Sequence, residues 1–253
     1  MKKLNQKNSD APDEFTLVEH LAELRTRLLY SLIAVVILSI FSYSISEYIF
    51  QIIRAPIQPH LPQGGLVFTA PTDKFMAYLK VSFFSGLIFA CPVWIFQVWR
   101  FIEPGLYTKE RRYGYYFMCF GTILFLTGVS FAYFLVLPTA TKFLLSFGSD
   151  VDTPMITINY YLSFFMKLTL VFGLAFQMPL ILGILGLLGI VSSSLLRRFR
   201  RPAIVIISVV AAFFTPPDIM SMVLLMGPLW FLYELSIWIV AFIEPKDLEN
   251  RGD

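Results

Sequence analysis

The sequence predicts an all-α integral membrane protein with six transmembrane helices, both termini cytoplasmic, and short fifth and sixth spans. Of its 253 residues, 57% are hydrophobic and only 15% are charged, whereas a soluble domain has about 25% charged residues. Several stretches without any charge reach the ~20 residues that are needed to cross ~30 Å of hydrocarbon. The basic residues gather on one side of these stretches, so the net charge of +3 indicates membrane topology and gives no reason to expect a nucleic-acid partner.

Four apolar runs predict the first four spans. The expected spans are Leu28–Ser46, Phe75–Trp99, Tyr113–Leu137 and a fourth that begins near Ile158 and continues to Val191. Pro92 lies inside the second run and Pro179 inside the fourth. Proline in a membrane helix usually marks a kink that neighbouring groups repair, so we expect bends at both positions.

The last pair of spans is unusual because only Pro202–Pro217 separates Arg201 from Asp218. At ~1.5 Å per residue this run reaches only about 24 Å, which is short of a full bilayer. Ile219–Ile243 then returns as a longer run. We therefore expect the turn between the two runs to lie below the far surface, or the membrane to be thinner there.

The distribution of basic residues predicts the orientation. Most of the 20 Lys and Arg residues fall on the side that would hold both termini, and the opposite side would carry only Arg54, Lys74 and Lys142. An excess of Lys and Arg marks the cytoplasmic side. The chain then divides into a cytoplasmic segment with an amphipathic helix (1–27), a six-span membrane domain (28–243) and a cytoplasmic tail (244–253), in a bacterial inner membrane by default.

No catalytic or cofactor motif stands out in the sequence. Cys91 and Cys119 lie within apolar runs without CxxC or Cys/His spacing, so we interpret them as small buried side chains. There is no Walker-type Gly-rich loop and no cluster of histidines and carboxylates. We therefore expect neither an enzyme nor a cofactor or metal site.

The segment "TLVEHLAELRTRLL" before the first span predicts an amphipathic helix at or entering the membrane surface. Its leucines recur every three or four residues, and Glu19, Glu23 and Arg27 share another face at spacings of four. A structural explanation is available, since Thr16 and Glu19 fit a capping box and Glu23 with Arg27 forms a favourable helical pair.

The segment "FIEPGLYTKERR" between the second and third spans predicts a turn followed by a new helix. Thr108 can cap that helix, and Glu110 would then be stabilised in its first turn. Capping does not explain why Glu23, Glu103 and Glu110 all lie at span ends on a basic face. A carboxylate at the low-dielectric boundary can hold a guanidinium through two parallel hydrogen bonds, so this face could receive an arginine-bearing ligand.

Four motifs in a matching order carry a family resemblance. They are "HLAELRTRL" before the first span, "FIEPGLYTKERR" between spans two and three, "FGLAFQMP" in span four and "TPPD" between spans five and six. Together they resemble the TatC family, the receptor subunits of the twin-arginine protein translocase. The resemblance covers the chain from about Val18 to Ile243.

The resemblance implies a site for the twin-arginine signal peptide of a folded cargo protein. Two glutamates are the family's main contacts, and they fall on Glu23 and Glu110, whereas Glu103 is less constant and ranks lower. Three neighbouring arginines would either orient these carboxylates or meet lipid phosphates. They are Arg25, Arg111 and Arg112.

Three further polar residues become candidates for intramembrane or partner contacts. The family often has a glutamate where this chain has Gln177, and glutamine cannot exchange protons near neutral pH, so a proton-binding mechanism at this position is put in doubt. Asp218 matches the acid of the "TPPD" motif and could equally cap the sixth helix. Glu234 should face protein or water because facing lipid would be costly.

The resemblance also implies partners and a mechanism. Docking of the signal peptide would recruit a TatB-type single-span subunit along spans five and six, and then a TatA-type subunit under the proton-motive force. The chain would work as a binding and assembly platform in a hetero-oligomer, with membrane lipid around it.

Three other functions stay open at the level of sequence. A secondary transporter could use Glu234, Gln177 and Lys167 at a midplane site, although it would predict an internal repeat that we do not find. An intramembrane enzyme would need a nucleophile with a nearby base, and neither His20 nor His60 lies within a span. An insertase would bind hydrophobic clients without regard to paired arginines.

Overall fold

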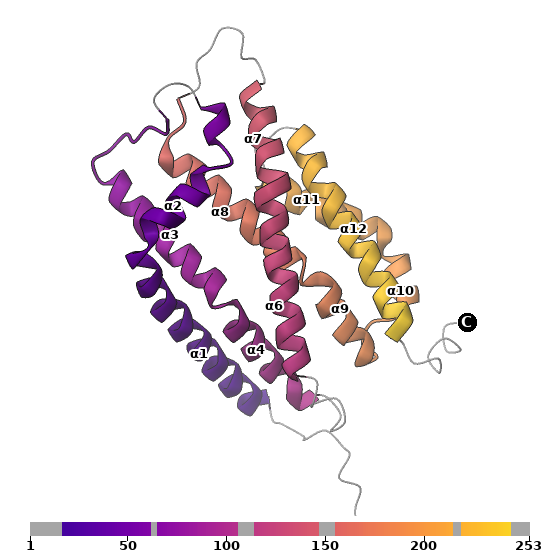
Figure 1. The fold of residues 1–253 in the computed structure, drawn as a ribbon. Coiled ribbons are helices and arrows are strands. Elements are labelled where there is room, and N and C mark those ends of the chain that lie inside the picture. The colour runs from indigo at the N-terminus through magenta and orange to yellow at the C-terminus, as the bar shows by residue number, and fades with distance from the viewer. Residues whose placement is uncertain (1–16, 62–64, 106–113, 147–154, 215–218, 244–253) are drawn as a thin grey trace, which may run out of the picture.

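The structure is a computed structural model, and it describes residues 17–61, 65–105, 114–146, 155–214 and 219–243. Helices account for nearly all of these residues, and the only β contact among them is a single parallel bridge between Val67 and Thr157. The helices form one bundle in which α1 lies at one edge, α10, α11 and α12 lie at the opposite edge, and α6 runs between them (Figure 1). The all-α membrane fold is thus as predicted.

The first helix is longer than the predicted first span. Helix α1 extends from Leu17 to Ser44 without a break, so the amphipathic motif and the apolar run form one continuous helix. It packs along α3 and α4, and most of its apolar run faces away from the protein. At Gly86 of α3 the backbones come so close that a Cβ atom would lie 2.6 Å from the Ser39 backbone nitrogen.

The second span is a bent pair of helices. Helix α3 (Asp73–Phe89) and helix α4 (Cys91–Ile102) meet at Ala90 with an angle of 52° between them. Pro92 occupies the first turn of α4, where it has no N–H to continue the hydrogen bonds of α3. The bend predicted from this proline is therefore present.

The third span continues through a wider turn. Helix α6 (Gly114–Phe131) passes into a five-residue π-helical turn, η3 (Ala132–Val136), and then into α7 (Leu137–Ser146). Pro138 lies at the start of α7 and lacks the N–H that would bond to the carbonyl four residues earlier. A local π turn is a common adjustment at such an interruption.

The fourth span also breaks where proline predicts it. Helix α8 (Ile158–Ala175) begins at the Thr157 cap, whose hydroxyl accepts from the Tyr160 N–H, and α9 (Met178–Leu187) begins after Gln177 with Pro179 in its first turn. Helix α8 supplies the fully buried Leu162, Leu168 and Phe172 and forms the centre of the main core.

Two tyrosine hydroxyls connect the short helix α2 (Ser46–Arg54) to the core through hydrogen bonds. The Tyr161 hydroxyl donates to the Ile53 carbonyl at 2.6 Å, and the Tyr133 hydroxyl donates to the Ile52 carbonyl at 2.8 Å. Both carbonyls lie in the last turn of α2, where a helix has no donors of its own to satisfy them.

The last part of the chain comprises α10 (Ser193–Arg198), α11 (Arg200–Phe214) and α12 (Ile219–Ile243). Helix α11 has 15 residues and is as short as predicted, but α12 has 25 residues and is long enough to cross a bilayer. Among the described residues, four helices pass as candidate spans and the bent α3–α4 pair makes up to five. The count of six therefore stays a prediction.

Candidate functional site

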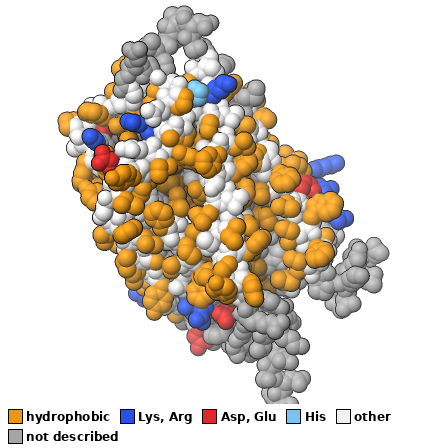
Figure 2. All heavy atoms as spheres, in the orientation of Figure 1, with side chains coloured by type: hydrophobic (Ala, Val, Ile, Leu, Met, Phe, Trp, Pro, Cys, Tyr) orange, Lys and Arg blue, Asp and Glu red, His pale blue; other side chains and the backbone are white. Residues whose placement is uncertain are grey.

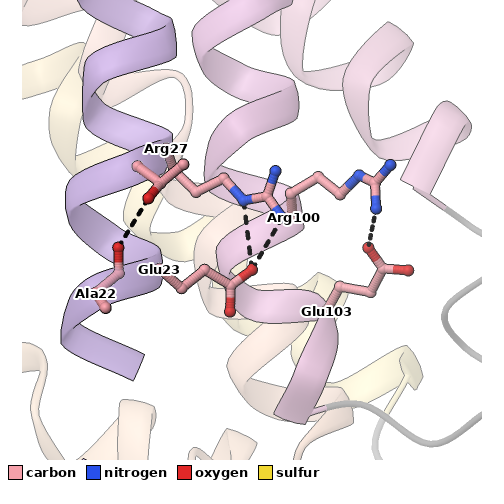
Figure 3. A network of polar contacts seen from close by, with 6 residues as sticks. Ala22, Glu23, Arg27, Arg100 and Glu103 are labelled. Carbon is pink, nitrogen blue, oxygen red and sulfur yellow. Dashed lines mark hydrogen bonds and ion pairs between the residues drawn. The ribbon is translucent and has the colours of Figure 1, made fainter. Parts of the chain in front are cut away.

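Two pairs of charged residues lie at the end of the bundle where α1 begins and α4 ends. Helix α1 carries Glu23 and Arg27, and the end of α4 carries Arg100 and leads into Glu103. Figure 3 shows the four side chains in the space beside these two helices. We call these four residues the carboxylate face.

Glu23 is held by an arginine of its own helix. Both Nε and Nη2 of Arg27 donate to the same carboxylate oxygen, Oε1, at 3.3 and 3.0 Å. The two side chains are only 25% and 21% exposed, so the pair is partly shielded from water. The spacing of four residues places them on one face of α1, as the sequence predicts.

Glu103 is held less tightly. Arg100 Nη1 lies 3.8 Å from Glu103 Oε2, and the guanidinium of Arg100 also lies 5.6 Å from the centre of the Phe96 ring. Glu103 begins the short 3₁₀ turn Glu103–Gly105, which ends the helical run after α4. A contact of 3.8 Å at a partly exposed site adds little stability and leaves the carboxylate free to change partners.

A ring contact joins the two elements that carry these glutamates. The rings of His20 on α1 and Phe101 on α4 stack at 4.3 Å with an angle of 22° between their planes. The sequence placed His20 outside the spans and gave no reason to single out Phe101. His20 and Phe101 lie in the same two motifs as Glu23 and Glu103. That shared location was the signal that could have identified the stacked pair.

Several predicted site residues lie outside the described residues. They are Glu110, Arg111, Arg112 and Asp218. Arg25 is described and is exposed on α1. The structure therefore brings together Glu23 and Glu103, with their arginines, and leaves the predicted partnership of Glu23 with Glu110 as a prediction.

Gln177 is buried within the chain. Its side chain is only 6% exposed, and its amide nitrogen donates to the Gly121 carbonyl of α6 at 2.9 Å. This bond ties the break between α8 and α9 to α6. A contact between Gln177 and a partner stays a prediction, and it would require this side chain to become accessible.

Glu234 faces protein, as predicted. Its Oε2 accepts from Arg200 Nη2 at 2.8 Å, which links α12 to the beginning of α11. The ion pair neutralises a carboxylate on a helix that is otherwise apolar and explains how the helix can carry it.

A groove of about 600 Å³ runs between α6, the α8–α9 break and α12. Phe131, Phe176 and Phe231 line it, and Thr127 contributes a hydroxyl. Such an apolar lining lacks the convergent polar groups that fix a small polar solute. Among the described residues, no group of three or more histidine, cysteine or acidic side chains is arranged to hold a metal ion.

Comparisons with known proteins agree with the fold and the motifs. The family model "Sec-independent protein translocase protein (TatC)" matches residues 19–228. Proteins of that name from Campylobacter jejuni and Aquifex aeolicus are 42% and 41% identical to this chain. The first match covers 92% of this chain and 97% of the relative, and the second covers 92% and 98%.

A solved structure gives the same result. The crystal structure of the twin-arginine translocase receptor TatC superposes with a TM-score of 0.81 at 40% sequence identity, covering 88% of this chain and 99% of the other. The secure family match, the shared fold and the motifs at the ends of α1 and α4 together lead to one conclusion. The chain belongs to the TatC family of Sec-independent protein translocase proteins, which are membrane components of protein transport.

Proposed function

We propose that this chain binds the twin-arginine signal peptide of folded proteins at the carboxylate face, with Glu23 and Glu110 as the main contacts. The observation that carries the proposal is the state of Glu23. Its Oε1 accepts both bonds from Arg27, and Oε2 has no partner among the described residues. A partly shielded carboxylate with one oxygen that is not used by Arg27 is well suited to receive a second guanidinium.

Binding two arginines through two carboxylates gives specificity as well as affinity. A guanidinium can offer two parallel N–H groups to one carboxylate, whereas a lysine ammonium acts as a point charge without that geometry. The site would therefore distinguish paired arginines from paired lysines, although both carry the same charge. Arg25, Arg111 and Arg112 would orient the carboxylates or contact lipid phosphates.

The decisive test is crosslinking of a twin-arginine signal peptide, and of its twin-lysine variant, to membranes that contain the full chain. We expect a crosslink with the arginine peptide that is lost in Glu23→Ala and in Glu110→Ala, and weakened in Glu103→Ala. Glu47→Ala is the matched control because Glu47 is an exposed carboxylate on α2, away from the carboxylate face. Equal crosslinking throughout would mean that these glutamates only stabilise their helices.

The same proposal includes assembly with single-span partners. A TatB-type subunit would dock along α11 and α12, and a TatA-type subunit would follow under the proton-motive force, in a bacterial inner membrane with both chain termini cytoplasmic. The supporting observation is the outer face of α11, where Val205, Val209 and Phe213 recur every four residues and are 62%, 63% and 75% exposed.

Single cysteines on α11 test this assembly. Val209→Cys should crosslink to a single-span partner, whereas Ala211→Cys should not, because Ala211 is fully buried on the other face of the same helix. Crosslinks that form only within the same chain would remove the docking proposal and would leave the signal-peptide site unaffected.

A further inference from the structure

The corner between α10 and α11 concentrates positive charge beside an apolar helix. Arg197, Arg198, Arg200 and Arg201 occupy four of five successive positions, and all of them are exposed. Figure 2 shows basic side chains gathered on the right flank of the molecule, in a surface that is otherwise mostly hydrophobic. Topology alone requires basic residues near a span, but it does not require them to line a cavity.

Two of these arginines form one wall of a pocket. The pocket has a volume of about 250 Å³, and Arg197 and Arg200 line it from one side. Ile237, Trp238 and Ala241 of α12 line it from the other side. The pocket is therefore cationic on the wall formed by α10 and α11 and apolar on the wall formed by α12.

The cationic wall is fixed in place by contacts that do not use Arg197. The Tyr233 hydroxyl of α12 donates to the Leu196 carbonyl at 2.8 Å, and Glu234 holds Arg200 at 2.8 Å. Among the described residues, no carboxylate pairs with Arg197. Counting the described residues alone, the pocket keeps a net positive charge after the Arg200 pair is included.

The apolar wall continues as a stripe along α12. Phe231, Leu235, Trp238 and Phe242 follow one another at spacings of three or four residues, so they share one face of the helix. Their exposed fractions are 66%, 39%, 75% and 92%, which is expected of side chains that face hydrocarbon. Trp238 belongs both to this stripe and to the pocket, and a tryptophan ring suits the depth where headgroups meet acyl chains.

We propose that this pocket binds the phosphate of an anionic phospholipid, with an acyl chain lying along the α12 stripe. Arginine recognises phosphate oxygens through paired N–H groups, and basic pockets between membrane helices are typical sites for anionic headgroups. Free phosphate shares this chemistry. It would leave the apolar wall and the stripe uncovered, whereas a phospholipid covers both, so the membrane lipid is the occupant that the whole surface fits.

The test uses the full chain in phosphatidylcholine vesicles that contain a small fraction of photoactivatable phosphatidylglycerol. We expect crosslinks to map to residues 193–243, and photoactivatable phosphatidylcholine to label this segment less. Arg197→Gln should reduce the phosphatidylglycerol crosslink about fivefold, which corresponds to one arginine near an anionic headgroup. Arg197→Lys should retain most of it, since lysine keeps the charge.

Arg198→Gln is the matched control because it removes the same charge one position away, and Arg198 does not line the pocket. An equal loss in Arg198→Gln and Arg197→Gln would overturn the proposal and indicate a diffuse basic surface. Unchanged labelling in Arg197→Gln would also overturn it. Soluble inorganic phosphate should not displace the lipid, and full displacement would identify a phosphate site instead. Thermal unfolding of each variant in detergent checks that the helices still fold.

Discussion

The Arg27 guanidinium bound to Glu23 resembles the ligand that the carboxylate is proposed to receive. Both of its hydrogen bonds end on one oxygen, and both partners are partly shielded. An incoming arginine must therefore either share Glu23 with Arg27 or replace it. If the incoming arginine replaces Arg27, the ion pair between Arg27 and Glu23 must be broken and opposes binding.

Replacing Arg27 should make the site easier to occupy. We expect Arg27→Gln to raise the affinity for a twin-arginine peptide between about 1.5-fold and fivefold, since a partly exposed ion pair contributes up to about 1 kcal/mol. The twin-lysine peptide should gain as well, so discrimination between the two should fall. Titration of a fluorescent peptide against the chain in nanodiscs measures both affinities.

Arg201→Gln is the control for net charge because Arg201 is an exposed arginine at the start of α11, away from the carboxylate face. An affinity that falls in Arg27→Gln as it does in Glu23→Ala would contradict competition. It would mean that Arg27 orients the carboxylate for the ligand.

Individual residues differed in how well the sequence predicted them. Spacing of four identified the Glu23–Arg27 pair, and the cost of facing lipid predicted that Glu234 faces protein or water, of which the structure shows a contact with protein. The partner of Glu234, Arg200, is 34 residues away, and no local pattern connects the two. The stack of His20 on Phe101 was missed for the same reason, because it depends on how α1 crosses α4.

At the scale of helices, some pairs of helix backbones lie so close together that a glycine at the contact cannot be replaced without a steric clash. A Cβ atom on Gly128 of α6 would lie 2.5 Å from the Phe172 carbonyl oxygen of α8. Backbone cannot move aside as a flexible side chain can, so Gly128→Ala should lower the free energy of unfolding by about 1 to 3 kcal/mol. Unfolding in a denaturing detergent series measures this loss.

Gly227→Ala on α12 makes the same substitution where nothing lies within 4 Å. It should be neutral or should stabilise the chain by up to about 1 kcal/mol, because alanine restricts the unfolded chain more than glycine does. Equal destabilisation by both substitutions would show that the contact between α6 and α8 is not the cause.

The tyrosine that fastens α2 to α8 gives a second prediction at this scale. Tyr161→Phe removes the hydroxyl that bonds to the Ile53 carbonyl at 2.6 Å and leaves that carbonyl buried without this donor. We expect a loss of about 1 to 3 kcal/mol in the free energy of unfolding. Tyr160→Phe should change stability by less than about 0.5 kcal/mol, since Tyr160 is 79% exposed.

Prolines made the helix breaks predictable, but the helix ends were harder to place. Pro92 lies just after the break between α3 and α4, and Pro179 lies just after the break between α8 and α9. The sequence predicted an amphipathic helix and a first span as separate elements, whereas the structure joins the two in one continuous helix, α1. The fastening of α2 to α8 could not be predicted, since it joins residues that lie 108 positions apart.

For the whole molecule, orientation in the membrane is the main prediction that remains. In a background where Cys91 and Cys119 are replaced by serine, we expect Gln58→Cys to react with an impermeant thiol reagent added outside intact cells. Ser194→Cys should react only after the membrane is opened, because it lies next to the arginines that we expect on the cytoplasmic side. The reverse pattern would invert the topology and place the carboxylate face outside.

The fold class of the whole chain was predicted from composition and run length alone, because crossing hydrocarbon imposes a strict requirement on both. The mutual arrangement of the helices was not predicted. Which helices meet depends on side-chain shape, as in the contact of α9 with α12, and composition carries no information about it. The sequence therefore singled out Glu23 and Glu103 as candidate site residues but did not predict the packing of α1 against α4.

The sparse burial of α1 has a consequence for how the chain is made. Helix α1 contacts chiefly α3 and α4, which follow it in the sequence, and α4 and α8 in turn contact α6. Helices α1, α3, α4 and α6 therefore each meet a neighbour that is synthesised shortly before or after them. The apolar surface of α1 can contact hydrocarbon before the later helices are made. The later helices can then pack against α1 in the order of synthesis.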